Sequence, residues 1–345
     1  LALHYCKNYD PASAGSDYGI PLVTEYAPSS DYSKYPGRSS LKETFDFIVK
    51  DLEQASNLVG IQGEAQSAYI TLDVVEALKA RVYLEMEDYQ NAAAAAQGLI
   101  NSKRYTLISD GDAYKKMWLN DVGTEAIWQF AMSKTETGSN ALGSSFMGIV
   151  DKLPRPSYLP VKSVLNLYDK ENDIRYDAYF TTGLIDRQVG DDIEVTYCSK
   201  WPGNPELYEG KSNNVNKLKA FRISEMYLIA AEAYAMLNQE DKASEMLNEL
   251  KKIRIKGWTE TGYNGAALMQ EIQDERVREL FAEGNRLFDM KRWKIGMKRS
   301  SSDAQRDDYL PALGTDIEKE ATDNRWVWPI PKDEMDSNPQ LKGQQ

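Results

Sequence analysis

The sequence predicts a mainly α-helical fold in which helical hairpins stack as a scaffold and a long, irregular, loop-rich insertion forms the opposite face. Apolar residues recur at helical spacing near both ends of the 345-residue chain. A helical hairpin in the N-terminal part is matched in register by a second one further along. Between them, residues 102–216 lose this periodicity and are rich in Gly, Pro, Asn, Ser and Tyr. With 42% hydrophobic residues, the chain can bury a large core.

The first of these helices is predicted over residues 39–59. It begins with serines followed by Glu43, the pattern of a capping box. Phe45, Val49 and Leu52 then follow at helical spacing and give the helix one apolar face.

Two helical hairpins come next and share a pattern. The first joins residues 71–86 to 89–101 through a short turn, and the second joins 222–238 to 240–254. Five positions of the first recur in the second at an offset of 151 residues, namely Ala80, Tyr83, Met86, Ala92 and Leu99 with Ala231, Tyr234, Leu237, Ala243 and Leu250. This is the helix–turn–helix pattern of a tetratricopeptide repeat, although two unrelated amphipathic hairpins would look similar. Such units cannot bury their faces alone, so we expect the hairpins to stack.

The remaining segments are mostly irregular. Residues 151–160 and 197–210 predict long structured loops, and residues 125–132 a short β-like run. The segment after the final helix, residues 325–341, is predicted to be extended because its prolines disfavour a helix.

One predicted helix, residues 273–293, carries an acid or a base at almost every turn. Its charged residues lie three or four apart, the spacing of an intrahelical ladder of ion pairs, at Arg276, Glu279, Glu283, Arg286, Asp289 and Arg292. Its apolar residues supply a packing face: Val277, Leu280, Phe281, Leu287 and Phe288. A glycoside hydrolase needs two carboxylates facing across a cleft, which one helix cannot supply. We therefore predict that this helix is part of the scaffold.

Composition argues against several classes of protein. The net charge of −12 is not concentrated in one block, and no basic stripe marks a nucleic-acid binder. A single histidine, His4, leaves little room for zinc sites or histidine-based catalysis, and we expect no cofactor and no metal. Asp110 and Asp112 offer oxygens to calcium, but solvated turn residues are the better interpretation. Cys6 and Cys198 are either free or paired.

Three motifs in the C-terminal half occur in a fixed order and resemble the SusD/RagB family of outer-membrane nutrient-binding lipoproteins. They are FRISEMYLIAAEAYAMLNQEDKASEMLNELKKIR, IQDERVRELFAEGNRLFDMKRW and WPIPKDEMDSNPQL. The second motif matches the family pattern at Glu275, Arg276, Glu279, Leu280, Glu283, Gly284, Arg286, Asp289 and Arg292. The third matches at Pro329, Ile330, Pro331, Glu334, Asn338 and Pro339.

Earlier segments are also similar to the family, so the resemblance covers essentially the whole chain. These segments are YGIPLV, SSLKETFDFIVKDLEQA, and SYLPVKSVLNLYDKENDIR with its Asp173 and Arg175. The resemblance implies one SusD-like domain over residues 1–345. Within it, residues 1–101 would form N-terminal repeat helices, 102–216 the ligand-face region, and 217–345 the C-terminal repeat helices and the extended tail.

The resemblance also implies a function. Family members are surface lipoproteins of Bacteroidetes-type bacteria that capture an oligosaccharide, starch-like or another glycan, for a SusC-like TonB-dependent outer-membrane transporter, and they catalyse no reaction. Members begin with a signal peptide, a lipidated cysteine and further helices. We therefore expect native N-terminal sequence, with the lipid anchor and part of the ligand site, to lie outside this chain, and Cys6 is no candidate for lipidation.

The resemblance points to residues 133–216 for ligand binding. From this region we choose six residues as glycan-binding: Asn140, Phe146, Arg155, Tyr158, Tyr197 and Trp201. Tyr158 and Trp201 would stack on sugar rings, and Asn140 and Arg155 would donate to hydroxyls. The alternative for each is a role in loop packing. The other tryptophans are predicted to lie in the core or at its rim: Trp118, Trp128, Trp293, Trp326 and Trp328, with Trp258 left open as a ligand or transporter contact.

Two other functions fit the pattern less well. An all-helical glycoside hydrolase would need a marked pair of carboxylates, and none is evident. A tetratricopeptide scaffold that binds only protein would not need the long irregular insertion.

Overall fold

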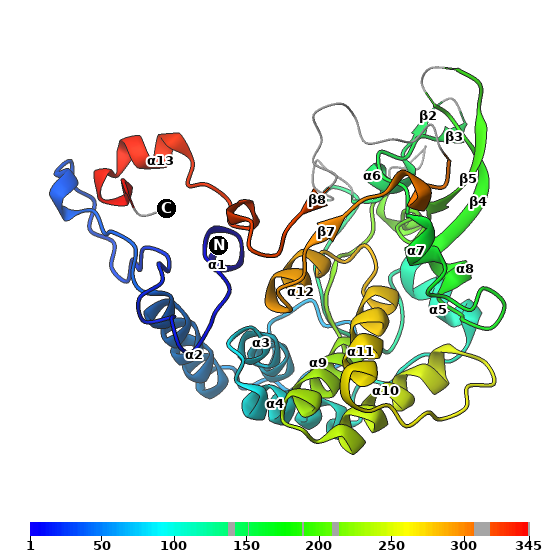
Figure 1. Cartoon of the computed structure of the whole chain (residues 1–345), viewed down its shortest axis with the longest axis horizontal. Coiled ribbons are helices and arrows are strands. Elements are labelled where there is room, and N and C mark those ends of the chain that lie inside the picture. The colour runs from blue at the N-terminus through cyan, green and yellow to red at the C-terminus, as the bar shows by residue number, and fades with distance from the viewer. Residues whose placement is uncertain (137–141, 151, 188–189, 209–213, 307–317, 344–345) are drawn as a thin grey trace.

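Two helical hairpins pack against each other in the lower part of the computed structural model of this chain (Figure 1). Their helices are α3 (Leu72–Glu85), α4 (Tyr89–Ser102), α9 (Ile223–Met236) and α10 (Glu240–Arg254). The matched small residues are all fully buried in one shared core: Ala80, Ala92, Ala231 and Ala243. Tyr83 and Tyr234 are partly buried against the same core. The predicted stacking of the two hairpins is confirmed.

The structure describes residues 1–136, 142–150, 152–187, 190–208, 214–306 and 318–343. Within these ranges, no helix is long and apolar enough to cross a bilayer. Cys6 and Cys198 are both buried and free, which settles the alternative that the sequence left open.

The N-terminal part carries α1 (Ala2–Tyr5) and α2 (Leu41–Leu58). The predicted capping box is present, since the Ser40 hydroxyl accepts from the Glu43 backbone N–H at 3.1 Å and the Glu43 carboxylate accepts from the Ser40 N–H at 2.8 Å. Phe45 and Leu52 face a second core that they share with Val75 of α3. This packing fixes α2 beside the first hairpin, as Figure 1 shows.

The charged segment forms two helices, α11 (Gly265–Glu279) and α12 (Arg286–Arg292), so the prediction of one helix over 273–293 is wrong. The chain turns between them, with Ala282 at φ 59° and Gly284 at φ 86°. Both values lie in the left-handed region, which ends an α-helix. Burial also differs from the prediction, because Glu275 and Glu279 are fully buried while Val277 is only half-buried.

The insertion contains short elements that lie above α10 in the view of Figure 1. Its helices are α5 (Gly111–Leu119), α6 (Ser144–Met147), α7 (Lys162–Leu165) and α8 (Tyr176–Tyr179). Its hairpins pair β2 (Ile149–Val150) with β3 (Leu153–Pro154) and β4 (Phe180–Ile185) with β5 (Ile193–Cys198). An aromatic core supports it, formed by Tyr114, Trp118, Tyr168, Tyr179, Phe180 and Trp201. The mainly α prediction with a loop-rich insertion is therefore confirmed.

Two further strand pairs link distant parts of the chain. The β-like run predicted over 125–132 forms β1 (Ala126–Gln129), which pairs antiparallel with β6 (Lys219–Arg222). β7 (Met297–Lys298) pairs with β8 (Glu318–Lys319). Short 3₁₀ helices lie at Tyr32–Lys34, Pro205–Leu207, Ser301–Asp303, Asn324–Trp326 and Pro339–Leu341.

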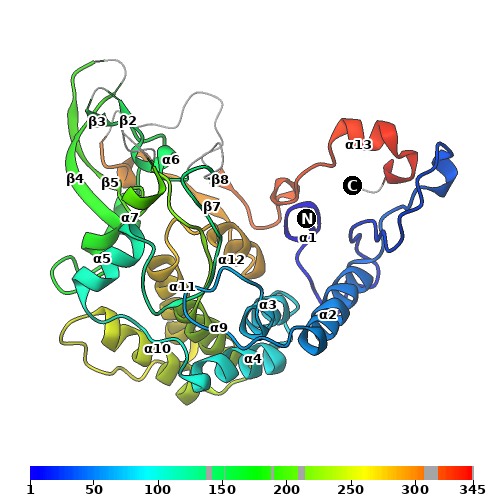
Figure 2. The ribbon, with the colours of Figure 1, turned by 180° about the vertical axis from the view of Figure 1, so that it is seen from behind.

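The C-terminal tail returns to the N-terminal segment. The backbone N–H of Trp328 donates to the backbone carbonyl of His4 at 2.8 Å. Figure 2 shows α1 beside this part of the tail. The tail is extended only between the 3₁₀ helix at Asn324–Trp326 and α13 (Lys332–Ser337), whose N-cap is Pro331. The prediction of an extended segment to residue 341 is wrong here, because a proline at the start of a helix removes no helical hydrogen bond.

Candidate functional site

Tyr158 lies open on the surface of the insertion, with 65% of the residue exposed. The Phe146 ring lies 6.3 Å from its ring, at an angle of 54°. The backbone of this loop is fixed, since the Ser157 N–H donates to the Ser145 carbonyl at 2.9 Å. The two rings therefore form an aromatic surface on an ordered loop, which we call the Tyr158 patch.

Arg155 lies three residues before Tyr158 and is paired with Asp186. Its Nε donates to Asp186 Oδ2 at 3.0 Å, and its Nη2 contacts the same oxygen. The side chain is 34% exposed, so the guanidinium is fixed in place and still reaches solvent. This placement suits the predicted role of Arg155 as a donor to a ligand hydroxyl.

Tyr197 and Trp201 do not lie at the surface with Tyr158. Tyr197 is 8% exposed and packs with Ile185 and Val195 of the β4–β5 hairpin. Trp201 is 2% exposed, and its ring centroid lies 5.1 Å from that of Trp118 at 81°. The predicted stacking role of Trp201 needs an open ring face, so the structure contradicts it, and the core position follows from the large apolar area of the indole. Asn140 lies outside the described residues.

A groove of about 960 Å³ lies between the N-terminal segment and the C-terminal tail. Trp328 lines it and is 48% exposed, which corrects the prediction that it lies in the core or at its rim. The ring centroids of Tyr5 and Trp328 lie 5.9 Å apart, with an angle of 85° between the ring planes. Arg38 and Tyr18 lie on the same groove, with the guanidinium carbon 5.4 Å from the ring centroid. The sequence analysis missed this groove because its two walls come from opposite ends of the chain.

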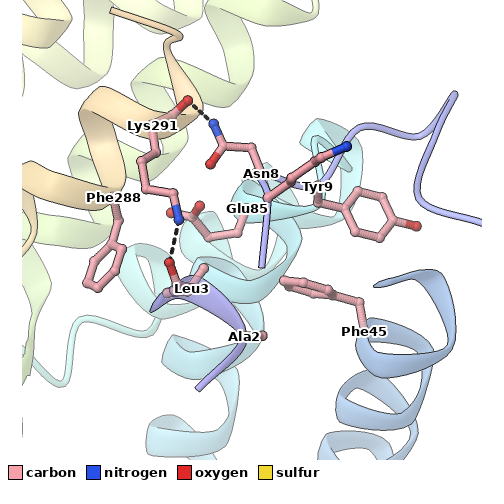
Figure 3. Close-up of a pocket in the computed structure, with 9 residues that line it drawn as sticks. Ala2, Leu3, Asn8, Tyr9, Phe45, Glu85, Phe288 and Lys291 are labelled. Atoms are coloured by element: carbon pink, nitrogen blue, oxygen red, sulfur yellow. Dashed lines mark hydrogen bonds between the residues drawn. The ribbon is translucent and has the colours of Figure 1, made fainter. Parts of the chain in front are cut away.

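A small pocket beside this groove shows how the N-terminal segment is held (Figure 3). Lys291 of α12 donates through Nζ to the carbonyls of Leu3 at 2.5 Å and Cys6 at 3.2 Å. In return, the Asn8 amide donates to the Lys291 carbonyl (Figure 3). The pocket measures about 10 Å³, close to the space of one water molecule. It is an anchoring point for the segment and too small for an organic ligand.

The acidic and basic residues of α11 form a buried network with arginines from other elements. Glu279 accepts from Arg222 Nη1 at 2.8 Å, from Arg254 Nη2 at 2.9 Å and from Arg175 Nη1 at 3.0 Å. Arg175 precedes α8, Arg222 ends β6 and Arg254 ends α10. The network therefore ties the insertion to β6, α10 and α11. The predicted intrahelical ladder is largely wrong, because most ion pairs of the segment join it to other elements. Glu275–Arg278 and Asp289–Arg292 are exceptions, since their partners lie three residues apart on one helix.

The electrostatics of this network keep its carboxylates ionised. Burial alone would raise the pKa of Glu279, but the guanidiniums of Arg254 and Arg222 outweigh it and hold the pKa well below the ordinary value. The pKa of Glu283 is lowered in the same way by Arg222 and Lys200. A general acid needs a carboxyl whose pKa is raised. These groups are therefore structural, as the scaffold interpretation of the segment predicted.

Lys200 joins the network to the aromatic core of the insertion. Its ammonium lies 4.1 Å from the Trp118 ring centroid and 3.9 Å from that of Tyr179, and it donates to Glu283 at 2.7 Å. Burial lowers its pKa to about 8, although the Glu283 carboxylate opposes this shift. No local sequence pattern marks this role of Lys200, because its partners lie on distant segments.

The described ranges contain no group of three His, Cys, Asp or Glu side chains that could hold a metal ion. Asp110 caps α5 instead, since its carboxylate accepts from the Ala113 N–H at 2.8 Å. The calcium interpretation of Asp110 and Asp112 therefore has no support from these residues.

Stacked helical hairpins that carry a loop-rich insertion define this chain as a helical-repeat protein of mainly α class. Residues 182–345 match the model of the SusD family. SusD-like protein P38 of Formosa agariphila is 24% identical over 370 residues, which cover 94% of this chain and 69% of that protein. The resemblance to the SusD family that the motifs indicated is thus confirmed.

Solved structures agree in fold over almost the whole chain. A SusD superfamily protein from Bacteroides thetaiotaomicron matches with a TM-score of 0.78 and 26% identity, covering 99% of this chain and 74% of that one. A protein from Bacteroides vulgatus described as a putative sugar binding protein matches with a TM-score of 0.75 and 23% identity, covering 99% and 73%. The chain thus has the SusD fold but spans only part of the length of these relatives.

Proposed function

We propose that this chain binds an oligosaccharide and does not cleave it. The observation that carries the proposal is the Tyr158 patch, whose exposed aromatic ring lies on the same loop as the fixed guanidinium of Arg155, three residues earlier in the chain. Sugar rings offer apolar C–H faces to an aromatic ring and hydroxyls to an arginine. The similarity to a solved protein described as sugar-binding supports the same class of ligand.

Three of the predicted residues remain in the proposed site. Tyr158 would stack on a sugar ring, Phe146 would support it from below, and Arg155 would donate to a hydroxyl. Asn140 stays a prediction as a further donor to the ligand. Tyr197 is buried with Ile185 and Val195 in the β4–β5 hairpin and is not part of the proposed site.

The non-catalytic part of the proposal rests on the buried carboxylates. Glycoside hydrolysis requires one carboxyl with a raised pKa facing a second across the ligand. The network carboxylates Glu275, Glu279 and Glu283 have lowered pKa values instead and are held by arginines or a lysine. They suit a scaffold that keeps a binding face rigid.

We also infer that residues 1–101, 102–216 and 217–345 form one domain. The ion pair between Arg175 and Glu279 joins the second and third of these segments, and the pair between Arg81 and Glu225 joins the first and third. All of these side chains are buried except Arg81, which is 29% exposed.

The family resemblance supports a finer proposal about the cell. The protein would sit on the outer-membrane surface through an N-terminal lipid anchor and deliver its glycan to a SusC-like TonB-dependent transporter. Copurification of the native protein with such a transporter from outer membranes would support this step. Recovery of the native protein in a soluble fraction, with no transporter bound, would count against it.

The binding proposal is tested by a glycan array followed by calorimetry on each hit. Tyr158→Ala should weaken binding about tenfold, which corresponds to about 1.4 kcal/mol for a lost stacking contact. Tyr26→Ala is the matched control, because Tyr26 is 94% exposed in the segment before α2. An equal loss of affinity in Tyr158→Ala and Tyr26→Ala would argue against a site at the Tyr158 patch. So would the absence of any glycan that the chain binds.

A further inference from the structure

Two adjoining hollows lie between α3, β6 and the turn that joins α11 to α12. The first measures about 240 Å³ and the second about 170 Å³. Four residues line both of them, namely Arg81, Glu225, Glu283 and Asn285. Because they share these walls, we treat them as one site and call it the inner cavity.

The inner cavity has an unpartnered buried donor in each part. Trp201 lines the first hollow and is 2% exposed, and its indole Nε1 has no hydrogen-bond partner among the described residues. Arg276 lines the second, its side chain is 4% exposed, and its Nη1 likewise lacks a partner in that part of the chain. Buried N–H groups nearly always have an acceptor. Because both residues line the cavity, their unpartnered N–H groups are available to a ligand that supplies oxygen atoms.

The charges on the cavity wall cancel one another. Arg81 donates twice to the Glu225 carboxylate, at 2.9 and 2.7 Å. Arg222 is paired with Glu283 at 2.7 Å. In the second hollow, Arg276 is paired with Asp289 at 2.7 Å. Since each cation faces a carboxylate, the wall favours a neutral ligand over an ion.

The same walls can also accept hydrogen bonds and contact apolar groups. Each carboxylate oxygen of Glu225 accepts one hydrogen bond from Arg81, which leaves it lone pairs for a ligand hydroxyl. Phe130 and Leu218 line the first hollow, and they are 43% and 38% exposed. They form an apolar rim that reaches solvent. A ligand with hydroxyls at its edge and C–H groups on its faces matches this combination.

We propose that the inner cavity binds one neutral sugar unit, with Trp201 Nε1 and Arg276 Nη1 donating to its oxygens and Glu225 accepting from a hydroxyl. The inference rests on the proposed function only for the class of ligand, since the site shares no lining residue with the Tyr158 patch. Its occupant is either a free monosaccharide or the terminal residue of a longer glycan. Both sources have the same chemistry, and the experiment separates them.

The test follows the indole N–H signals of the seven tryptophans by ¹H–¹⁵N NMR of the isotope-labelled chain. The probes are methyl α-glucoside, methyl β-galactoside, methyl α-mannoside and each oligosaccharide hit from the array. The Trp201 signal should shift saturably with at least one probe. Trp118 is the internal control, because its Nε1 is also buried and unpartnered among the described residues but lines neither hollow.

Trp201→Phe keeps the packed ring, removes the donor and assigns the signal. It should weaken binding of the active probe about tenfold, the effect of one hydrogen bond, whereas Trp118→Phe should not. If Trp201→Phe does not fold, the titration of the unmodified chain still decides. A shift with a methyl glycoside identifies a free sugar as a sufficient ligand, and a shift with oligosaccharides alone identifies a terminal residue.

An unmoved Trp201 signal with every probe would overturn the inference, as would equal shifts of Trp118 and Trp201. The two proposals fail separately. Glycan binding that Tyr158→Ala weakens, with no shift of Trp201, would leave the proposed function standing and reject the inner cavity. A Trp201 shift with a methyl glycoside, together with oligosaccharide binding that Tyr158→Ala leaves unchanged, would support the inner cavity and reject the Tyr158 patch as the glycan site.

Discussion

Replacing Glu279 by glutamine tests whether the buried network holds the insertion on the hairpins. The carboxylate accepts four hydrogen bonds from arginines, from Arg222 at 2.8 Å, from Arg254 at 2.9 and 3.0 Å, and from Arg175 at 3.0 Å. All four side chains are 0–1% exposed. Glutamine has the same shape but carries no charge and turns an N–H₂ group toward the arginine donors.

The expected loss follows from this burial. Removing one partner from a buried ion pair costs about 3–5 kcal/mol, because the remaining charge stays uncompensated. Arg254 and Arg222 keep the Glu125 carboxylate, at 2.8 and 3.2 Å, and Arg175 keeps Asp173 at 2.8 Å. These contacts limit the effect, so we expect Glu279→Gln to lower the free energy of unfolding by about 3 kcal/mol, at the lower end of that range.

Urea unfolding followed by circular dichroism measures this change. The matched control is Asp46→Asn, which breaks the exposed pair between Lys42 and Asp46 on α2. That pair is exposed and screened by solvent, so Asp46→Asn should leave the free energy of unfolding almost unchanged. A loss below about 1 kcal/mol for Glu279→Gln, comparable to the control, would refute the assignment of Glu279 as the centre of the network.

Three further predictions concern the scaffold. Ser40→Ala removes the N-cap of α2 and should lower the free energy of unfolding by about 1 kcal/mol in urea, with no change in ligand affinity. Ala231→Leu overpacks the core between the hairpins and should cost about 1–3 kcal/mol, whereas the same change at exposed Ala94 should cost almost nothing. The pKa of Glu279 is lowered in the folded chain. Its contribution to the free energy of unfolding is therefore complete above pH 4.5, the ordinary pKa of a glutamate, and is lost as the pH falls below that value. The melting temperature should therefore drop more steeply below pH 4.5 in the unmodified chain than in Glu279→Gln.

The parts of the fold that the sequence predicted have local signals. The capping box at Ser40 and Glu43 and the five matched hairpin positions depend on residues a few places apart, and the structure has both. The turn between α11 and α12 lacked such a signal. A single glycine, Gly284, did not distinguish a break from a continuous helix, and Ala282 at φ 59° has no side-chain feature that marks a left-handed conformation.

The charged segment was misread because its partners lie far away in the sequence. Arg175, Arg222 and Arg254 approach Glu279 only after the insertion folds onto the second hairpin. Helical spacing within the segment therefore suggested intrahelical pairs and an apolar packing face. The structure packs Leu280 and Phe281 as predicted, but it also buries the charged face, where each charge meets an opposite one.

The candidate site was predictable only in part. Tyr158 lies in a proline-flanked loop, which agrees with its exposure, whereas Trp201 looked equivalent in sequence and is packed on Trp118. Which tryptophan is buried depends on the fold of the whole insertion. The inner cavity has walls from α3, β6 and the turn after α11, so no single segment of the sequence could reveal it.

The most direct test of the account measures binding and turnover on the same glycan. Each array hit is titrated by calorimetry into the chain and then kept with an equimolar amount of it, while mass spectrometry follows the glycan over time. The account predicts micromolar-to-millimolar affinity, about tenfold weaker in Tyr158→Ala, with the glycan intact at every time point. Steady appearance of shorter products that depends on the chain would contradict it and identify a hydrolase.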